Sequence, residues 1–344
     1  MPTRFIYSDL YLLLRGTSVF KTMNAKTLYH SRITPKSPEG DFFSPFRGRG
    51  VNDGMPFFHY IFIAGCISLL GLFSCEERVN INTQASPPRL VIYGYITTDT
   101  TQQAISITRS TGYFVTTKPE GISNAKVSIS CDSQVFVLKE SSDEQGVYLT
   151  SADVYGIPGK TYTLHVAVDF NGDGNTEKYE AASYLPFPAT LDSAAVVPSP
   201  ALNDHLQALV WGNLPEESSG YFSFHLFRNG KALNDSLRGF QIVQDDYINT
   251  KAITALPVFL LDQKDEEDKL SQGDTVTVQV ESITSEYATF IDNARTELRG
   301  PIPLFGGPPA NIKTNIQCLD ANSKTGVSGF FTAYSKRKVS TVMK

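Results

Sequence analysis

The sequence lacks clusters of basic residues, and its formal net charge is −5. Binding to nucleic acid relies on Lys and Arg patches that neutralise phosphates, so this absence argues against a nucleic-acid partner. The first 74 residues are basic overall, which makes the remaining chain more acidic than the total suggests. Divalent cations are therefore the expected charged partners.

The sequence also lacks the motifs that identify common reactions. It has no G-x-S-x-G nucleophile elbow, no glycine-rich phosphate loop and no internal repeat. The histidines beyond the leader are His165, His205 and His225, and none has the cysteine or glutamate spacing of a zinc site. His165 and His225 fall in alternating segments, where we expect structural histidines. We expect a protein that is not an enzyme.

The composition favours strands. Tyr (16) and Phe (22) are abundant, Val, Ile and Thr recur in short alternating runs, and Gly (25) and Pro (19) separate these runs. A chain of 344 residues can bury a sizeable core and is long enough for two domains. We predict an all-β fold: an N-terminal immunoglobulin-like or prealbumin-like sandwich, then a second sandwich-like module carrying one α-helix.

One apolar segment, 57–74, ends in the letters LFS directly before Cys75. This ending resembles the lipobox of bacterial lipoproteins, in which the cysteine receives lipid and becomes the new N-terminus after cleavage. Several acyl chains would anchor the protein without a membrane-spanning segment. An uncleaved transmembrane anchor is the alternative. The segment 1–54 fits no secretory leader, which makes Met55 a candidate for the true start.

The residues after Cys75 and the two later cysteines give two further predictions. Glu76 and Glu77 resemble the export signal that places lipoproteins of Bacteroidota on the outer face of the outer membrane, which predicts a surface-exposed outer-membrane lipoprotein. Cys131 and Cys318 lie far apart in the sequence. They form either a disulfide or two small thiols in the core.

Alternating segments predict strands at, among others, 90–97, 104–109, 161–168 and 237–243, and Asn229-Gly230 predicts a hairpin turn. The pattern of strands and turns divides the chain into four parts. Pro186 and Pro188 mark the boundary between the two modules. Ser285 is a candidate N-cap for the helix, and Gly300-Pro301 would end it. The helix should pack into the core through one apolar stripe, which consists of Tyr287, Phe290, Ile291, Ala294 and Leu298. The predicted parts are a leader at 1–74, a tether at 75–88, a sandwich at 89–186, a second β-rich module at 187–344 and, within it, the helix at 285–299.

Several short segments, in their order along the chain, resemble one family. They are PRLVIYG (88–94), ISNAKV (122–127), GVY (146–148), GKTYTL (159–164), WGNLP (211–215) and PPANI (308–312). The family is a group of Bacteroidota lipoproteins known as the domain of unknown function DUF4249, often encoded beside TonB-dependent receptors. The first half also resembles carboxypeptidase-regulatory-like and prealbumin-like sandwiches. The resemblance implies no catalytic residues.

The sharpest local motif is DFNGDGNTEKYE at 169–180, which matches the twelve-residue calcium-loop pattern. Carboxylate and amide oxygens at such spacing, with a glycine for the turn, suit the coordination of Ca²⁺. Strands flank the motif, so it is not an EF-hand. The alternatives are a calcium-bound hairpin loop and an ordinary turn. The candidate ligands are Asp169, Asn171, Asp173, Asn175, Glu177 and Glu180.

Two classes of function fit these features. The first is a non-enzymatic surface lipoprotein that binds a ligand or partner and assists a TonB-dependent transporter, as the family resemblance implies. Its recognition surface would lie in the loops at the sandwich ends, including 301–309. The alternative is a surface glycan-binding module, or a hydrolase without a recognisable motif, because a fold can bring paired carboxylates together.

Overall fold

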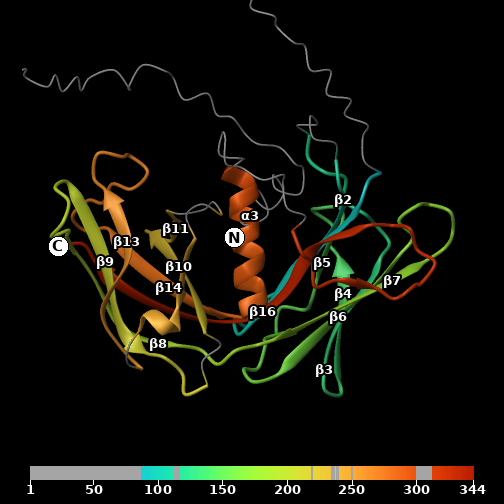
Figure 1. The fold of residues 1–344 in the computed structure, drawn as a ribbon, viewed down its shortest axis with the longest axis horizontal. Helices are drawn as coiled ribbons and strands as arrows, with labels where there is room; N and C mark the ends of the chain where they lie inside the picture. Colours follow the sequence, from blue (N-terminus) through green and yellow to red (C-terminus); the bar gives the residue numbers. More distant parts are fainter. Residues whose placement is uncertain are drawn as a thin grey trace, which may run out of the picture. The chain divides into compact units, whose positions relative to one another are not determined.

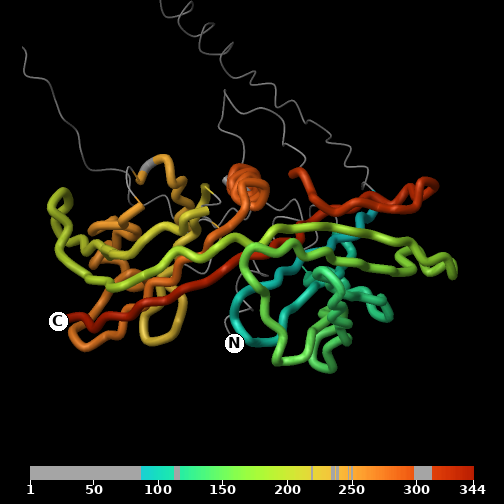
Figure 2. The backbone as a smooth tube through the Cα atoms, turned by 90° about the horizontal axis from the view of Figure 1, so that it is seen from below, coloured from blue at the N-terminus to red at the C-terminus, as the bar shows by residue number. Residues whose placement is uncertain are grey.

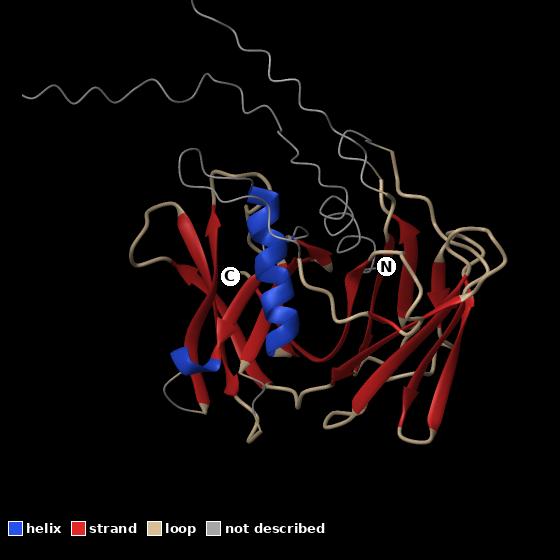
Figure 3. Ribbon diagram, turned by 45° about the vertical axis from the view of Figure 1, so that its right-hand side comes forward, coloured by secondary structure: helices blue, strands red, loops and turns tan. Residues whose placement is uncertain are grey.

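The computed structural model describes residues 87–111, 117–217, 220–233, 237, 240–248, 251–299 and 312–344. In this part of the chain strands dominate, and one α-helix accompanies them (Figures 1 and 3). A large mixed sheet and a smaller three-stranded sheet form two sandwich-like halves. The predicted all-β class with a single helix is therefore confirmed.

The first half is a sandwich built from alternating strands. In β6, Tyr162, Leu164, Val166 and Val168 are buried while the residues between them face outward, as the two-residue period of a strand requires. Their side chains meet those of β1, β2 and β5 in one core. The strands are β1 (Leu90–Thr97), β2 (Ala104–Arg109), β3 (Lys126–Cys131), β4 (Gln134–Glu140), β5 (Val147–Leu149), β6 (Thr161–Val168) and β7 (Glu177–Tyr184).

The second half has a sheet with different partners on its two faces. The strands β10 and β14 turn Phe222, Phe224 and Val278 toward the small sheet in one core. The helix α3 covers the opposite face. The elements are β8 (Thr190–Pro198), β9 (His205–Asn213), β10 (Tyr221–Arg228), β11 (Lys231–Ala232), β12 (Gln241–Gln244), the 3₁₀ helix η2 (Asp245–Tyr247), β13 (Ala252–Asp262), β14 (Thr275–Ile283), α3 (Ser285–Arg299), β15 (Gln317–Cys318) and β16 (Val327–Val342).

One strand, β16, belongs to both halves. Its first part pairs in parallel with β1, from Leu90 opposite Val327 to Thr97 opposite Tyr334, and its last part pairs antiparallel with β14. Figure 2 follows this red C-terminal strand from one half into the other. Every residue of β1 is buried, because the first core covers one face and the α3 core the other. The large sheet thus crosses the predicted module boundary near Pro186, and the division into two modules stays a prediction.

A glycine is required where β16 approaches β1 most closely. Gly329 has a φ of 102°, and a Cβ at this position would lie 1.9 Å from the carbonyl oxygen of Ile92. Only a residue without a side chain adopts this conformation readily.

Several sequence predictions match the observed boundaries. The strands β1, β2 and β6 and the helix α3 begin and end where the pattern placed them. The predicted helix stripe is buried at Tyr287, Phe290, Ile291 and Ala294, whereas the side chain of Leu298 and the stop at Gly300-Pro301 lie outside the described residues. The Asn229-Gly230 turn is also confirmed, with φ of 52° and 79° between β10 and β11.

Other predictions were wrong in detail. Thr284, not Ser285, caps α3: its side-chain oxygen accepts a bond from the backbone N–H of Tyr287 at 3.3 Å. The segments that form β8 and β13 were not predicted as strands. In β13 the pattern is interrupted at Pro257, which an edge strand tolerates beside a register shift. The strand predicted at 237–243 is shorter, because Leu237 and Phe240 pack under α3 instead.

Candidate functional site

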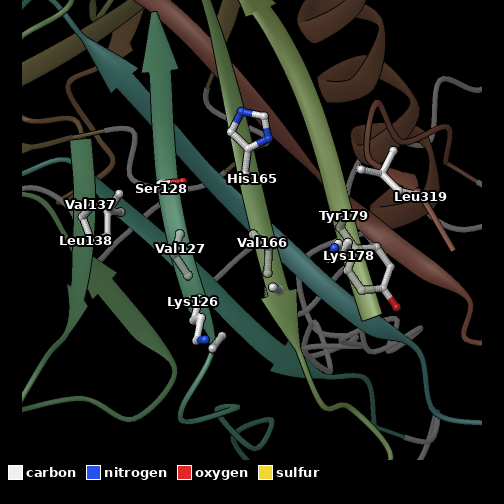
Figure 4. Close-up of a pocket in the computed structure, with 12 residues that line it drawn as sticks. Lys126, Val127, Ser128, Val137, Leu138, His165, Val166, Lys178, Tyr179 and Leu319 are labelled. Atoms are coloured by element: carbon white, nitrogen blue, oxygen red, sulfur yellow. The ribbon is translucent and has the colours of Figure 1, made fainter. Parts of the chain in front are cut away.

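An open pocket lies on the outer face of the first sandwich, over β3, β4, β6, β7 and β15. Its volume is about 490 Å³, within the usual range for small-molecule sites. Figure 4 shows His165, Ser128 and Lys126 on adjacent strands, with Leu319 at the far side. The outward positions of alternating strands supply these side chains, because the residues between them fill the core.

A histidine with two partners lies in the middle of this face. His165 of β6 contacts the Ser130 hydroxyl of β3 through Nε2 at 3.0 Å and the Glu180 carboxylate of β7 through Nδ1 at 3.3 Å. The strand register places Glu180 directly opposite His165. The histidine predicted to be structural is therefore hydrogen-bonded, but it is half-exposed and lines the pocket.

Two lysines lie on one row of the same face. Lys126 of β3 and Lys178 of β7 are both opposite Ala167 of β6 in the register. Both lysines are exposed. Neither ammonium group has an ion-pair partner within the described parts of the chain.

Exposed apolar side chains border the pocket. Val137 of β4 is 70% exposed, and Leu319 beside β15 is 54% exposed. Val135 also faces outward on β4. The strand is apolar on both faces here, because Phe136 and Leu138 pack into the first core, whereas a sheet surface in water normally carries polar residues. The two valines and Leu319 therefore form the apolar border of the pocket.

The loop of the calcium-like motif is held by its own backbone. The carboxylate of Asp169 accepts bonds from the N–H groups of Gly172, Asp173 and Gly174 at 2.7, 3.2 and 2.9 Å. Asp173 accepts a bond from the N–H of Asn175 at 2.8 Å. This bond is the main reason why the pKa of the exposed Asp173 carboxyl lies below its usual value.

The structure separates the two glutamates of the motif from its aspartates. Glu177 accepts bonds from the hydroxyls of Ser323 and Thr325 at 2.6 and 3.0 Å, and Glu180 contacts His165. Among the residues with assigned positions, no three His, Cys, Asp or Glu side chains converge in a way that could hold a metal ion. Asp169, Asn171, Asp173 and Asn175 stay together on the loop after β6, so calcium binding there remains a prediction.

The sequence pattern did not identify the residue that supports this loop. Arg109 of β2 donates a bond from Nη2 to the carbonyl oxygen of Phe170 at 2.6 Å, and its guanidinium lies 4.1 Å from the centre of the Phe170 ring. Phe170 is buried in the first core. The loop is therefore anchored at its second residue, and only the part after it projects into solvent.

A serine, a histidine and a glutamate also meet in the second half, beneath α3. Nε2 of His225 lies 3.2 Å from the Ser223 hydroxyl and 3.2 Å from the Glu281 carboxylate. A catalytic triad needs the serine and the acid on different ring nitrogens, whereas here both contact the same one. Ser223 is completely buried. This cluster is a structural network, as predicted for His225.

A comparison with known protein families shows to which family the chain belongs. A sequence profile described as "Domain of unknown function (DUF4249)" matches residues 76–340. The chain belongs to the DUF4249 family. The resemblance found in the short strand and turn motifs is thereby confirmed. No curated protein matches the chain.

Solved structures offer only weak likenesses to this DUF4249 member. Two β-glucuronidases, from Parabacteroides merdae and Bacteroides uniformis, align with 57% and 56% of this chain and 23% of theirs, at 10% and 11% identity and TM-scores of 0.19. The Yersinia pseudotuberculosis adhesin InvE aligns over 56% of this chain and 54% of its own, at 14% identity and a TM-score of 0.16. Scores this low carry no argument about function.

The predicted anchoring features lie mostly beyond what is described. The leader 1–74, the lipidation residue Cys75 and the acidic pair Glu76-Glu77 fall outside the described residues of this DUF4249 chain, as does the loop 301–309. None of the helices that are described is long and apolar enough to cross a bilayer. Cys131 and Cys318 are free thiols, the first buried and the second half-buried, so the disulfide alternative is not formed.

Proposed function

We propose that this DUF4249 protein is a non-enzymatic lipoprotein, exposed on the outer membrane surface, that binds a small ligand and assists a TonB-dependent transporter. The observation that supports it best is the open pocket of about 490 Å³ on the uncovered sheet face. Polar and apolar side chains converge there on rigid strands, which is the usual composition of a ligand site.

The rigidity of the strands supports a preformed binding surface. His165, Ser128 and Lys126 project from three positions on paired strands, so their spacing is fixed by backbone hydrogen bonds. Nearby Glu180 is already paired with His165. The pocket thus offers a preformed surface of donors and apolar contacts.

The anchor is the second element of the proposal. Cys75 follows an apolar segment and precedes two glutamates. Acylation of this residue would tether the described domain through a short polar segment that ends near β1. Replacing Cys75 by alanine should abolish labelling with a fatty-acid probe and release the protein from the detergent phase. Retention of residues 1–74 in the membrane-bound protein would favour the transmembrane anchor instead.

The accessory role is tested by affinity purification of the lipidated protein from native outer membrane. We expect a β-barrel receptor to be recovered in stoichiometric amounts. Recovery of the protein alone, together with measurable turnover on glycan or peptide libraries, would overturn the proposal in favour of the glycan-active alternative.

The location of the ligand site is tested separately with a matched pair of variants. Val137 borders the pocket at 70% exposure, and Val342 lies on β16 at 56% exposure. A ligand found by thermal-shift screening should raise the Tm of the wild type and of Val342→Asp by mass action, but not that of Val137→Asp. Equal shifts in both variants would place the ligand elsewhere.

A further inference from the structure

We infer that the pocket on the first sandwich takes a ligand with a carboxylate or phosphate group attached to an apolar body. This inference rests on the proposed binding function and specifies its ligand class. It comes from the arrangement of charge around the pocket in a protein whose net charge is negative.

The two pocket lysines form the anion-binding part. Both Lys126 and Lys178 flank Ala167 in register, and neighbouring strands lie about 4.8 Å apart, which separates the two Cα atoms by roughly 10 Å. The small side chain of Ala167 leaves the space between them open. A single anionic group on this floor lies within reach of both flexible ammonium groups.

Among the described residues that line the pocket, none has an acidic side chain. The neighbouring acids have other partners: Glu180 pairs with His165, and Glu177 accepts two hydroxyl bonds. Asp320 accepts a bond from the backbone N–H of Lys178 at 2.5 Å. The described lining of the pocket thus carries two ammonium groups and no carboxylate, which favours an anion over a cationic group.

The apolar rim identifies the rest of the ligand. Val137 and Leu319 border the pocket with 70% and 54% of their surface exposed. Covering apolar surface stabilises a complex in proportion to the area removed from water, whereas a free inorganic anion would leave both side chains exposed. A ligand with an apolar body uses both parts of the site.

The inference is tested by calorimetric titration of the full-length protein in detergent against a detergent blank. The probes are benzoate and phenyl phosphate as apolar anions, inorganic phosphate as an anion without an apolar body, and benzyl alcohol as the neutral analogue. We expect each apolar anion to bind at least about tenfold more tightly than benzyl alcohol and more tightly than inorganic phosphate. The relative affinity of benzoate and phenyl phosphate then tells which anion the site prefers.

Charge-reversal variants locate the binding. Lys126→Glu and Lys178→Glu should each weaken benzoate binding about tenfold, while Lys231→Glu, at an exposed lysine of the second half, gives the same change in net charge without effect. Lys126→Arg should retain binding. Circular dichroism checks that each variant is folded.

Three outcomes would overturn the inference. They are equal binding of benzyl alcohol and benzoate, equal effects of Lys126→Glu and Lys231→Glu, and no binding of any probe. Binding of neutral probes that is lost in Val137→Asp would leave the pocket as a ligand site and refute only its ligand class. Recovery of a receptor with the native protein does not depend on any of these results.

Discussion

Two cross-strand pairs of histidine and glutamate, one in each half of the molecule, use the same chemistry in opposite surroundings. His165 and Glu180 lie 3.3 Å apart with 44% and 43% of their side chains exposed. His225 and Glu281 lie 3.2 Å apart with 9% and 4% exposed. Each histidine also contacts a serine hydroxyl, of Ser130 or of Ser223.

The difference lies in what covers each sheet. The helix α3 and the aromatic residues around it close over the second pair, whereas the first pair faces an open pocket. An exposed pair of this kind adds little to stability because water solvates both side chains. Beneath a helix, removing one partner leaves the polar group of the other without that partner and without water. The buried pair therefore stabilises the fold, whereas the exposed pair is accessible to a ligand.

The largest effect should come from removing the buried acid. Glu281→Ala leaves His225 without its partner and Gln279 without the carboxylate that accepts its side-chain bond at 2.7 Å. We expect the free energy of unfolding to fall by about 3–5 kcal/mol. The matched change Glu180→Ala should cost less than about 1 kcal/mol. Urea denaturation of both variants measures the contrast, and similar losses would contradict it.

Acid should distinguish the buried pair in a second way. Burial opposes the charge on Glu281, but His225, followed by Lys336 and Gln279, outweighs this cost and holds the pKa of the carboxyl below its ordinary value of 4.5. A lowered folded-state pKa adds stability that is complete above about pH 4.5 and is lost as the pH falls through the folded value.

Denaturation curves between about pH 6 and pH 3 test this linkage. Wild-type stability should fall more steeply than that of Glu281→Gln, which has no carboxyl to titrate at this position. Glu180→Gln provides the control with the same chemical change on the open sheet face. Parallel curves for wild type and Glu281→Gln would refute the lowered pKa.

Calcium should affect only the half that carries the open pocket. If the loop after β6 binds Ca²⁺ through Asp169 and Asp173, stability should rise by about 1.4 kcal/mol when free Ca²⁺ is about tenfold above its Kd. Replacing both aspartates by alanine should remove the rise in Tm seen by calorimetry. If Tm does not rise at millimolar Ca²⁺, the loop is an ordinary turn that does not bind calcium.

The smallest effect should come from the cap of the helix that covers the buried pair. Thr284→Ala removes the bond to the N–H of Tyr287 and should cost about 1 kcal/mol of stability. Ser285→Ala, one residue further on, is the control and should cost less. Thermal denaturation measures both losses of stability. A larger loss for Ser285→Ala than for Thr284→Ala would show that Ser285 is the cap, as the sequence pattern predicts.

The sequence could predict features that depend on neighbours along the chain. Alternation in 161–168 and the apolar stripe of the helix follow from local periodicity, and both are confirmed. Pairing between distant segments has no local signal. Nothing in the sequence near Leu90 indicates that Val327 lies opposite it. The edge strand β13 was not predicted either, because its alternating pattern is interrupted at Pro257.

The pocket could not be predicted for the same reason. Lys126, His165 and Lys178 come from three strands, and only the register of β3, β6 and β7 places them on one face. In the linear sequence Lys178 belongs to the calcium-like motif, in which the acidic residues and not the lysine have the spacing of a known site. The motif itself was visible because its aspartates and asparagines are consecutive, while the diverging partners of Glu177 and Glu180 depend on the fold.

Strand β16, which both halves share, limits how early either half can complete its strand pairing. The first residues of the sandwich, in β1, leave the ribosome long before their parallel partner, because Val327 follows its partner Leu90 by more than two hundred residues. Until then β1 presents an unpaired edge, the kind of surface on which other chains add strands. Closing so long a loop is slow. Both halves therefore reach their final pairing only after β16 has been made, since this strand pairs with β1 and with β14.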